Sequence, residues 1–405
     1  MEQGKQTALL ASYLKRLAAG EALDSVRRDF VRHFASVMPE DIMAAEQELV
    51  RGGTPLREVQ RLCDLHSALF HGRTEAEVRA ERAATERAAG KEAIDLDTLP
   101  AGHPVSLLRR ENEALLRLIQ SLQHDLALPK VPENFTQNFL TINAIRAHYA
   151  KKEELLMPVL YRYGVTGPSE VMWGVDDEIK KEIGLLSRVL KEDAANAVIY
   201  RGRIQAVLKR AEEMVYKEEK ILFPLSLRYF TPEEWYAIYR DCPEMGTALL
   251  KGEQPHWQKA EAWLFGQAAR EKGSEILSGK VQLAAGELTV RELRAIFALL
   301  PVDLTFIDRE NVLRFFTNEG KIFARPRAAL GREVFDCHPP QIVPMIKNML
   351  EDFKAKRRTH MDVARRIAGR PVLVRYAAVY DEAGEYLGTL EIVQDVSAAL
   401  EKFAK

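Results

Sequence analysis

The sequence predicts a multidomain chain with a small all-α N-terminal domain, an α-helical four-helix bundle and a C-terminal α+β domain. Three observations support this fold class. The 405 residues, 47% of them apolar, exceed what one undivided core usually organises. Apolar residues recur three and four positions apart in the first two regions, as in amphipathic helices. After Gly273 the pattern changes to the β-branched and aromatic runs typical of strands.

The N-terminal domain is expected over residues 1–75. Its apolar residues recur at helical spacing, and Gly20, Pro39 and the Gly52–Pro55 run divide the stretch into about four short helices. The segment 76–100 is charged and rich in alanine, with few large apolar residues. It is therefore expected to be a solvated helix or a linker.

The central domain is expected over residues 101–265. It contains four long amphipathic segments with Pro or Gly between them, and short connections between helices of this length predict an antiparallel bundle. A fifth helical stretch, which contains Trp235 and Trp257, is expected to pack against the bundle. The four segments run over about 104–126, 132–163, 168–190 and 194–229.

A second linker at 266–288 leads to a domain expected over 289–400. A helix is predicted at 341–356, and Glu382–Gly384 is a hairpin signal between the last two strands. Two strands, a helical region and a long hairpin form an α+β domain. The predicted strands cover 303–308, 312–317, 372–381 and 386–396.

Composition excludes several classes of function. The formal net charge is -1 with acidic and basic residues interleaved, which argues against a nucleic-acid partner. The three cysteines form no CxxC pair, which favours a reducing cytoplasm. No run of about 18 apolar residues or secretory signal is present, so we expect neither export nor a membrane span. Because phosphate-binding, hydrolase and dinucleotide motifs are also missing, an enzyme of those classes is not expected.

The first domain resembles the DUF438 family through EQELV at 46–50 and EVQRLCDLHSALF at 58–70. The family name implies no reaction. Cys63 and His66 lie three residues apart, so they could share a helix face as half of a soft metal site. The alternative is a buried thiol and a capped histidine in a helical core.

The second domain resembles hemerythrin-like HHE domains. The resemblance implies a four-helix bundle whose facing helices project His and carboxylate side chains inward to hold two iron ions. The matching segments are GHPV at 102–105, HYAKKEELLMP at 148–158, WGVDDEI at 173–179 and VYKEEKILFP at 215–224.

This chain departs from the family's pattern on two helices. The family's helix motif is His followed four residues later by Glu, which places both ligands on one face. Here Lys152 stands four residues after His148. Glu153 is one residue further and points roughly 140° away from His148, at about 100° per residue. On the last helix the corresponding positions are Met214 and Glu218.

The implied metal is non-heme iron, possibly a di-iron pair, or another metal. Asp177 stands where the third helix is expected to carry His, and the first helix keeps a histidine. Heme is an alternative cofactor, with His148, His103 and Met214 as conceivable axial ligands. The metal ligands that the resemblance implies are His103, His148, Asp177 and Glu218.

A bundle without metal is the third possibility. The ammonium of Lys152 would be repelled by metal cations. Beside Glu218 or Asp177, the same ammonium could replace the charge of the metal by an ion pair.

The third domain resembles PAS domains through LLPVDLTFID at 299–308, GREVFDCHPPQIV at 331–343 and DEAGEYLGTLEIVQDV at 381–396. PAS domains bind small ligands, heme or flavin and report their occupancy, so the resemblance implies sensing rather than catalysis.

Cys337 and His338 are the candidate cofactor-binding residues of this domain. Pro339 and Pro340 fix the backbone directly after them. The thiolate and imidazole could bind heme, bind a metal or act as a redox switch. Alternatively, the prolines start the next helix and His338 caps it or packs against it.

Together the resemblances imply a cytoplasmic, redox- or gas-responsive sensory protein that signals to a downstream protein partner. A homodimer is expected because PAS domains often pair through flanking helices. Two alternatives stay open. One is a di-iron protein that handles oxygen, peroxide or nitric oxide, or repairs iron centres. The other is a metal-free scaffold.

Overall fold

A computed structural model of the chain divides into two compact units. One contains Met1–Trp235 and Gly246–Trp257, and the other contains Tyr236–Met245 and Gln258–Lys405. In the first 94 residues, the structure describes 2–21, 25–26, 29–30, 33, 48–55 and 59. It also describes 95–403, apart from 167–170, 253, 275–278, 284, 318–321, 324, 340–341 and 368.

The N-terminal region contributes helix α1, Glu2–Ala18. Leu10, Tyr13 and Leu14 lie on one side of α1 and are buried against Phe30 and other apolar residues. This agrees with the expected helical packing. Most of the remaining N-terminal segment, with Cys63 and His66, lies outside the described residues.

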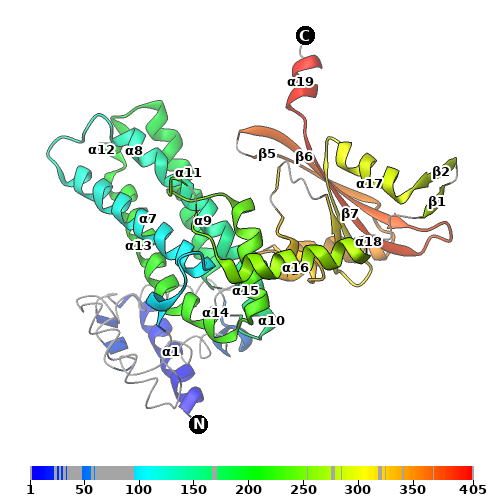
Figure 1. The fold of residues 1–405 in the computed structure, drawn as a ribbon. Coiled ribbons are helices and arrows are strands. Elements are labelled where there is room, and N and C mark those ends of the chain that lie inside the picture. Colours follow the sequence, from blue (N-terminus) through cyan, green and yellow to red (C-terminus); the bar gives the residue numbers. More distant parts are fainter. Residues whose placement is uncertain are drawn as a thin grey trace. The chain divides into compact units, whose positions relative to one another are not determined.

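The first unit contains the expected four-helix bundle (Figure 1). Its first helix is α7, Pro104–Ala127, and its third is α11, Trp173–Glu192. The second runs through α8 Phe135–Thr141, η4 Ile142–Ala144, α9 Ile145–Lys151, η5 Lys152–Leu156 and α10 Met157–Arg162. The fourth runs through α12 Asn196–Ile199, α13 Arg201–Lys217, η7 Glu218–Leu222 and α14 Phe223–Tyr229.

The second and fourth helices each contain a widened, π-helical turn. These turns are η5 and η7, and each is followed by an apolar residue and then Pro158 or Pro224. Proline has no N–H and its ring clashes with the carbonyl four residues back, so a π turn relieves the conflict. The two similar sequence motifs therefore give the same local geometry, and Lys152 and Glu218 begin the two turns.

The predicted fifth helical stretch is two helices. Helix α15 covers Pro232–Asp241, and α16 covers Gln258–Ser274, with the short η8, Cys242–Met245, after α15. Gly246 and Gly252 adopt positive φ angles of 75° and 87°, which interrupt a continuous helix.

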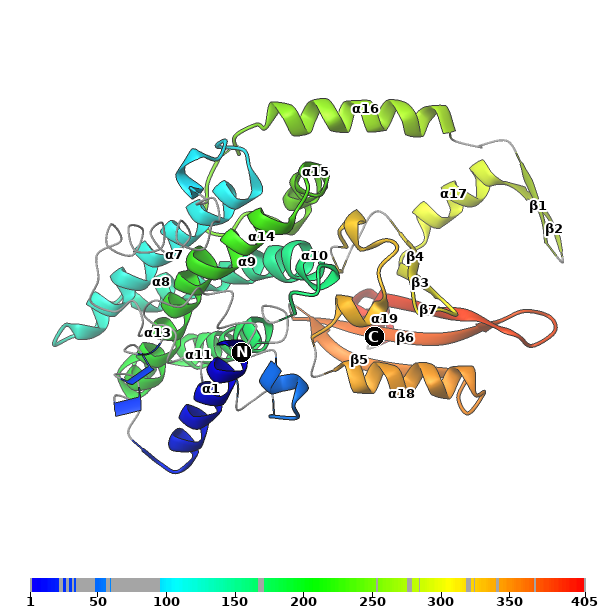
Figure 2. The ribbon, with the colours of Figure 1, turned by 90° about the horizontal axis from the view of Figure 1, so that it is seen from below.

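The second unit contains a five-stranded antiparallel sheet in the order β4-β3-β7-β6-β5. Helix α18, Val343–Lys354, packs on one face of this sheet (Figure 2). We call this the inner face. The strands are β3 Asp303–Asp308, β4 Leu313–Phe316, β5 His360–Ile367, β6 Arg370–Tyr380 and β7 Tyr386–Asp395.

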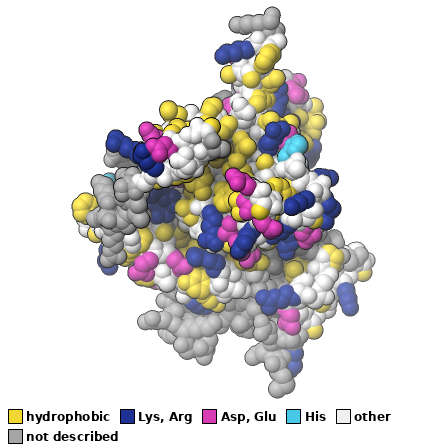
Figure 3. Space-filling view, turned by 90° about the vertical axis from the view of Figure 1, so that its right-hand side faces the viewer, with side chains coloured by type: hydrophobic (Ala, Val, Ile, Leu, Met, Phe, Trp, Pro, Cys, Tyr) yellow, Lys and Arg dark blue, Asp and Glu magenta, His cyan; other side chains and the backbone are white. Residues whose placement is uncertain are grey.

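Three further elements accompany the sheet. A hairpin of β1, Lys280–Leu283, and β2, Gly286–Thr289, leads into α17, Val290–Leu299, and α19, Ser397–Phe403, follows β7. A capping box between Thr289 and Glu292 starts α17. Basic and acidic side chains are interspersed over the face shown in Figure 3.

The α+β prediction is confirmed. The four predicted strands correspond to β3, β4, β6 and β7, and the hairpin signal is the turn at Gly384, whose φ is 80°. The prediction missed β5 and the β1-β2 hairpin. Strand β5 lies at the edge of the sheet and is mostly exposed, so its sequence carries charge where a buried strand would carry apolar residues.

Candidate functional site

Ionisable side chains from all four helices of the bundle meet in its interior. Each of them is at most 1% exposed. Charged groups are almost never buried to this extent unless they are paired. We call this group the buried charge cluster. It consists of Glu111 on α7, His148 and Lys151 on α9, Lys152 on η5, Asp176 on α11 and Glu218 on η7.

His148 links two carboxylates of the cluster. Its Nδ1 is 2.9 Å from Glu111 Oε2, and its Nε2 is 2.8 Å from Glu218 Oε2. Ionised carboxylates only accept hydrogen bonds, so both ring nitrogens donate. Burial by itself would lower the pKa of His148, but the two carboxylates outweigh it and raise the pKa to about 9. His148 is therefore an imidazolium at neutral pH.

Lys152 lies between Asp176 and the same Glu218 carboxylate that contacts His148. Its Nζ donates to Asp176 Oδ1 at 2.9 Å and also to Glu218 Oε1. The same ammonium is 4.0 Å from the ring centroid of Tyr149, a cation–π contact. Burial would raise the pKa of Glu218, but Lys152 and His148 lower it to about 2.

Glu111 connects the cluster to a neighbouring loop. Its Oε1 accepts from Lys151 Nζ at 2.7 Å and from the backbone N–H of Ala248 at 3.0 Å. With Oε2 bound to His148, both oxygens of this carboxylate have partners. Burial would raise the pKa of Glu111, but His148 and Lys151 hold it below its usual value.

The predicted ligand Asp177 lies outside the cluster. Its side chain is 29% exposed, and its Oδ1 pairs with Lys180 Nζ at 2.9 Å. The preceding residue, Asp176, is the buried one. Glu153 also pairs with Lys180, at 2.8 Å. Its helical angle predicted that it would point away from His148, and it makes no pair with that residue among the described contacts. Burial and the nearby Asp176 raise the pKa of Glu153 to about 8.

The predicted ligand His103 has a different role. It is the N-cap of α7, and its Nδ1 accepts from the N–H of Val105 at 3.1 Å. Its ring lies 4.6 Å from the ring centroid of Trp235 and 4.7 Å from that of Trp257. Burial lowers the pKa of His103 to about 4, so the ring is neutral. It shares no hydrogen bond or ion pair with the buried charge cluster among the described residues.

The donor set does not fit a metal centre. A protonated His148 has no lone pair to offer, and the Lys152 ammonium lies where a cation would meet Asp176 and Glu218. In the part of the chain that the structure describes, no three His, Cys, Asp or Glu side chains are arranged to hold a metal ion. Of the four implied ligands, the structure brings together only His148 and Glu218.

Sequence reasoning missed three members of the cluster, namely Glu111, Lys151 and Asp176. A signal for Glu111 was available. It lies four residues from both Leu107 and Leu115, which places it on the buried stripe of α7. A charged residue on such a stripe requires a buried partner.

Cys337 and His338, the candidate cofactor-binding residues of the second unit, lie in two different environments. Cys337 ends the short helix η10, Val334–Cys337, and packs against the apolar residues beneath α18. His338 Nδ1 donates to the carbonyl of Val334 at 2.7 Å, so its Nε2 carries the lone pair. Burial lowers the pKa of His338, which keeps this imidazole neutral. His338 thus caps the preceding short helix and not the helix that follows.

Comparison with known families confirms the three resemblances. Residues 10–76 match a family of unknown function, DUF438. Residues 103–226 match the hemerythrin HHE cation binding domain, and residues 293–397 match a PAS domain. The chain thus contains these three domains in this order, and in general terms they support a sensory or metal-binding signalling protein.

Similarity to individual proteins is more limited. A crystal structure described as a C-terminal domain from Streptococcus mutans is 28% identical, covers 31% of this chain and 98% of that chain, and has a TM-score of 0.30. No curated protein matches the chain. No described helix is both long and apolar enough to cross a membrane.

Proposed function

We propose that this chain is a signalling protein whose PAS domain binds the signal ligand and whose hemerythrin-like bundle works without metal. The observation that supports the second part is the position of Lys152, whose ammonium bridges Asp176 and Glu218. A metal ion there would have to displace this ammonium, because two cations cannot share the same carboxylates without strong repulsion.

The charge balance of the cluster supports the same proposal. Three carboxylates face three cations, since Glu111, Asp176 and Glu218 are matched by His148, Lys151 and Lys152. Such a cluster is formally neutral without metal. The di-iron alternative, with its oxygen or peroxide chemistry, requires free carboxylates and neutral imidazoles, and the cluster offers neither.

The signal itself is proposed to be a ligand or a redox change at the PAS domain. Cys337 has intermediate exposure and forms no disulfide among the described residues, and the neighbouring His338 offers the lone pair of its Nε2. Relay to a downstream protein partner, a homodimeric state and a cytoplasmic location belong to this proposal. The partner and the homodimer are proposed because PAS domains commonly relay signals and pair through flanking helices. The cytoplasmic location is proposed from the cysteine spacing.

Thermal unfolding of the full chain with iron(II) or with a chelator tests the proposal. A ligand that binds only the folded state raises the melting temperature. We expect neither reagent to change the melting of the wild-type bundle. Lys152→Glu should make melting depend on iron(II), because it replaces the central cation with a carboxylate. Lys191→Glu, at an exposed site on α11, is the matched control. Stabilisation of the wild-type chain by iron(II) would refute metal independence.

A further inference from the structure

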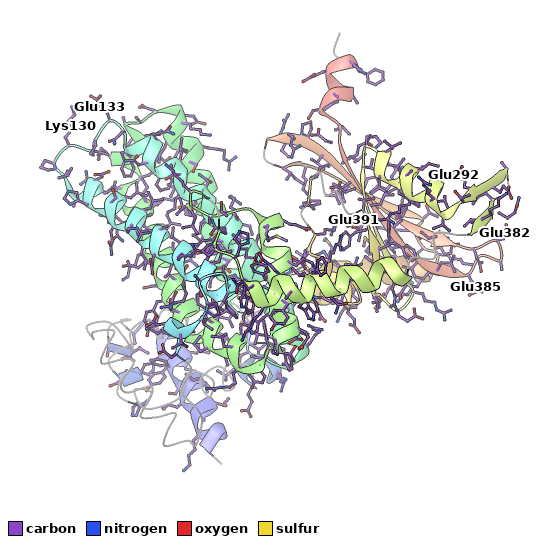
Figure 4. All side chains as sticks on the ribbon, in the orientation of Figure 1. Lys130, Glu133, Glu292, Glu382, Glu385 and Glu391 are labelled. Carbon is purple, nitrogen blue, oxygen red and sulfur yellow. The ribbon has the colours of Figure 1, made fainter. Side chains whose placement is uncertain are left out.

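Three polar side chains form a row across the inner face of the sheet. Thr305 on β3 is the cross-strand partner of Glu391 on β7, and Glu391 is the partner of Tyr376 on β6. Partners on one face of a sheet lie about 5 Å apart at Cβ. Strand β7 is the middle strand, so Glu391 lies well inside the sheet (Figure 4). We call these residues the polar row.

Apolar residues flank the polar row on both sides. Ile307 and Phe316 pack with α18 on one side, and Val374 and Val393 form a second apolar group on the other. A buried carboxylate in such surroundings requires a partner. Arg325 supplies it, because its Nη2 donates to Glu391 Oε2 at 2.6 Å.

The segment that carries Arg325 is fixed to the sheet. Asp303 at the start of β3 accepts backbone N–H groups from Ile322 at 2.9 Å and Phe323 at 3.3 Å through its Oδ2. Burial, followed by the charge of Glu391, raises the pKa of Tyr376 to about 12, so its hydroxyl keeps its proton.

Hydrogen-bonding atoms beside the row have no partner among the residues that the structure describes. Thr305 is 2% exposed, yet its Oγ1 makes no hydrogen bond, and the Nε of Arg325 is also buried without one. His338 carries a lone pair on its Nε2, and the charges of Glu391 and Arg325 act on this ring. Buried polar groups are normally satisfied, and exceptions call for a specific explanation such as a missing ligand.

We propose that the polar row binds a small neutral molecule with one carbonyl-type acceptor and one N–H or O–H donor, such as an amide. The acceptor would take the hydrogen bonds of Thr305 and Arg325, and the donor would reach His338. This inference rests on the proposed sensing role of the PAS domain and names its ligand class.

Three other ligand classes fit the row less well. A carboxylate would meet the negative charge of Glu391, while the cation of Arg325 is already paired. A hydrocarbon would leave the unpartnered atoms of Thr305 and Arg325 unsatisfied. Heme, a large and mainly apolar ring, would meet polar side chains in the middle of the face.

Methyl NMR of the full chain with 13C-labelled methionine methyls tests the proposal. Met361 on β5 is the cross-strand partner of Tyr376 and reports on the row, whereas Met157 and Met214 lie in the bundle and serve as references. The probes are acetamide, propionamide and benzamide, each compared with the carboxylate of the same shape, and toluene. We expect the amides to shift Met361, and each to bind at least about tenfold more tightly than its carboxylate.

Thr305→Val supplies the site-specific test. It removes an unsatisfied hydroxyl, so the fold should be retained, while amide binding should weaken about three- to tenfold. Thr141→Val, at an exposed position on α8, is the control and should bind like the wild-type chain. Unchanged affinity in Thr305→Val would overturn the proposal.

The outcomes separate the ligand class from the sensing role. Preferential binding of carboxylates or toluene at Met361 would refute a neutral hydrogen-bonding ligand but leave a ligand-binding PAS domain. Uptake of heme through His338 would do the same. No shift of Met361 with any probe would overturn the ligand class and count against sensing at this face.

Discussion

At the scale of single residues, the proposal of a metal-free bundle depends on Lys152. Its ammonium contacts Asp176 and Glu218 inside the protein, where an uncompensated charge costs several kcal/mol. To keep Asp176 and Glu218 paired, any replacement for the Lys152 ammonium must therefore place a positive charge in the same position.

Removing this charge should destabilise the bundle severely. Lys152→Met keeps most of the side-chain volume but leaves Asp176 without its ammonium partner and Glu218 with only His148. We expect a loss of about 3–5 kcal/mol in the free energy of unfolding, measured by denaturant titration. Lys191→Met, at an exposed position, should stay within about 0.5 kcal/mol of the wild-type value. A Lys152→Met chain as stable as the wild type would show that the ion pairs do not stabilise the fold.

His103 should make the stability of the chain depend on acid. Its folded pKa of about 4 lies below the ordinary value of 6.5, so the folded state favours the neutral ring. Its contribution is fully present above pH 6.5 and is lost as the pH falls through 4. His103→Asn keeps a capping acceptor but does not titrate. Unfolding free energies between pH 7 and 4 should fall less in this variant, and parallel curves would contradict the assigned neutral state.

At the scale of elements, glycine marks where the bundle is packed most closely. A Cβ on Gly102 would lie 2.6 Å from the carbonyl carbon of His256, whereas a Cβ on Gly202 in α13 would meet no atom within 4 Å. The first contact is with backbone and cannot be relieved by a side-chain rotation.

Alanine at these two glycines should therefore have opposite effects. Gly102→Ala should cost about 1–3 kcal/mol because the neighbouring backbone has to move. Gly202→Ala should stabilise the chain by about 0.5 kcal/mol, since alanine favours a helix more than glycine does. The melting temperatures of the two variants provide the measurement. Equal shifts would contradict the close approach.

The elements were predictable to the extent that their sequences show a clear period. The four bundle segments and the strands β3, β4, β6 and β7 follow from periodicity and turn signals. The edge strand β5 did not, because its exposed side chains remove the alternation. The π turns were also missed. They arise from Pro158 and Pro224 inside helices whose tertiary packing keeps them continuous.

The candidate site was predictable only in part. The spacing of His148 and Lys152 indicated that both face inward, and Lys152 does pair with Glu218. The sequence pointed to Asp177, whereas Asp176 is the residue in the cluster, because one residue changes the helical direction by about 100° and three acidic residues follow one another. Sequence periodicity predicts which face of a helix is buried. Which of several adjacent acidic residues lies on that face is decided by how the neighbouring helices pack.

At the scale of the whole molecule, the chain combines a DUF438 domain, a hemerythrin HHE domain and a PAS domain. A family match gives the fold of each part, whereas its chemistry depends on the residues present. In the bundle those residues are three carboxylates and three cations. In the PAS domain they are a partly buried ion pair and buried hydrogen-bonding atoms that have no partner among the described residues.

The iron content of the full chain tests metal independence most directly. The protein would be produced in iron-supplemented cells, purified without oxygen and measured by elemental mass spectrometry. Because Lys152 and His148 supply the positive charge of the cluster, we predict less than about 0.1 iron per chain, and the same for other transition metals. One or two tightly bound irons per chain, lost on substitution of Glu218, would contradict the account.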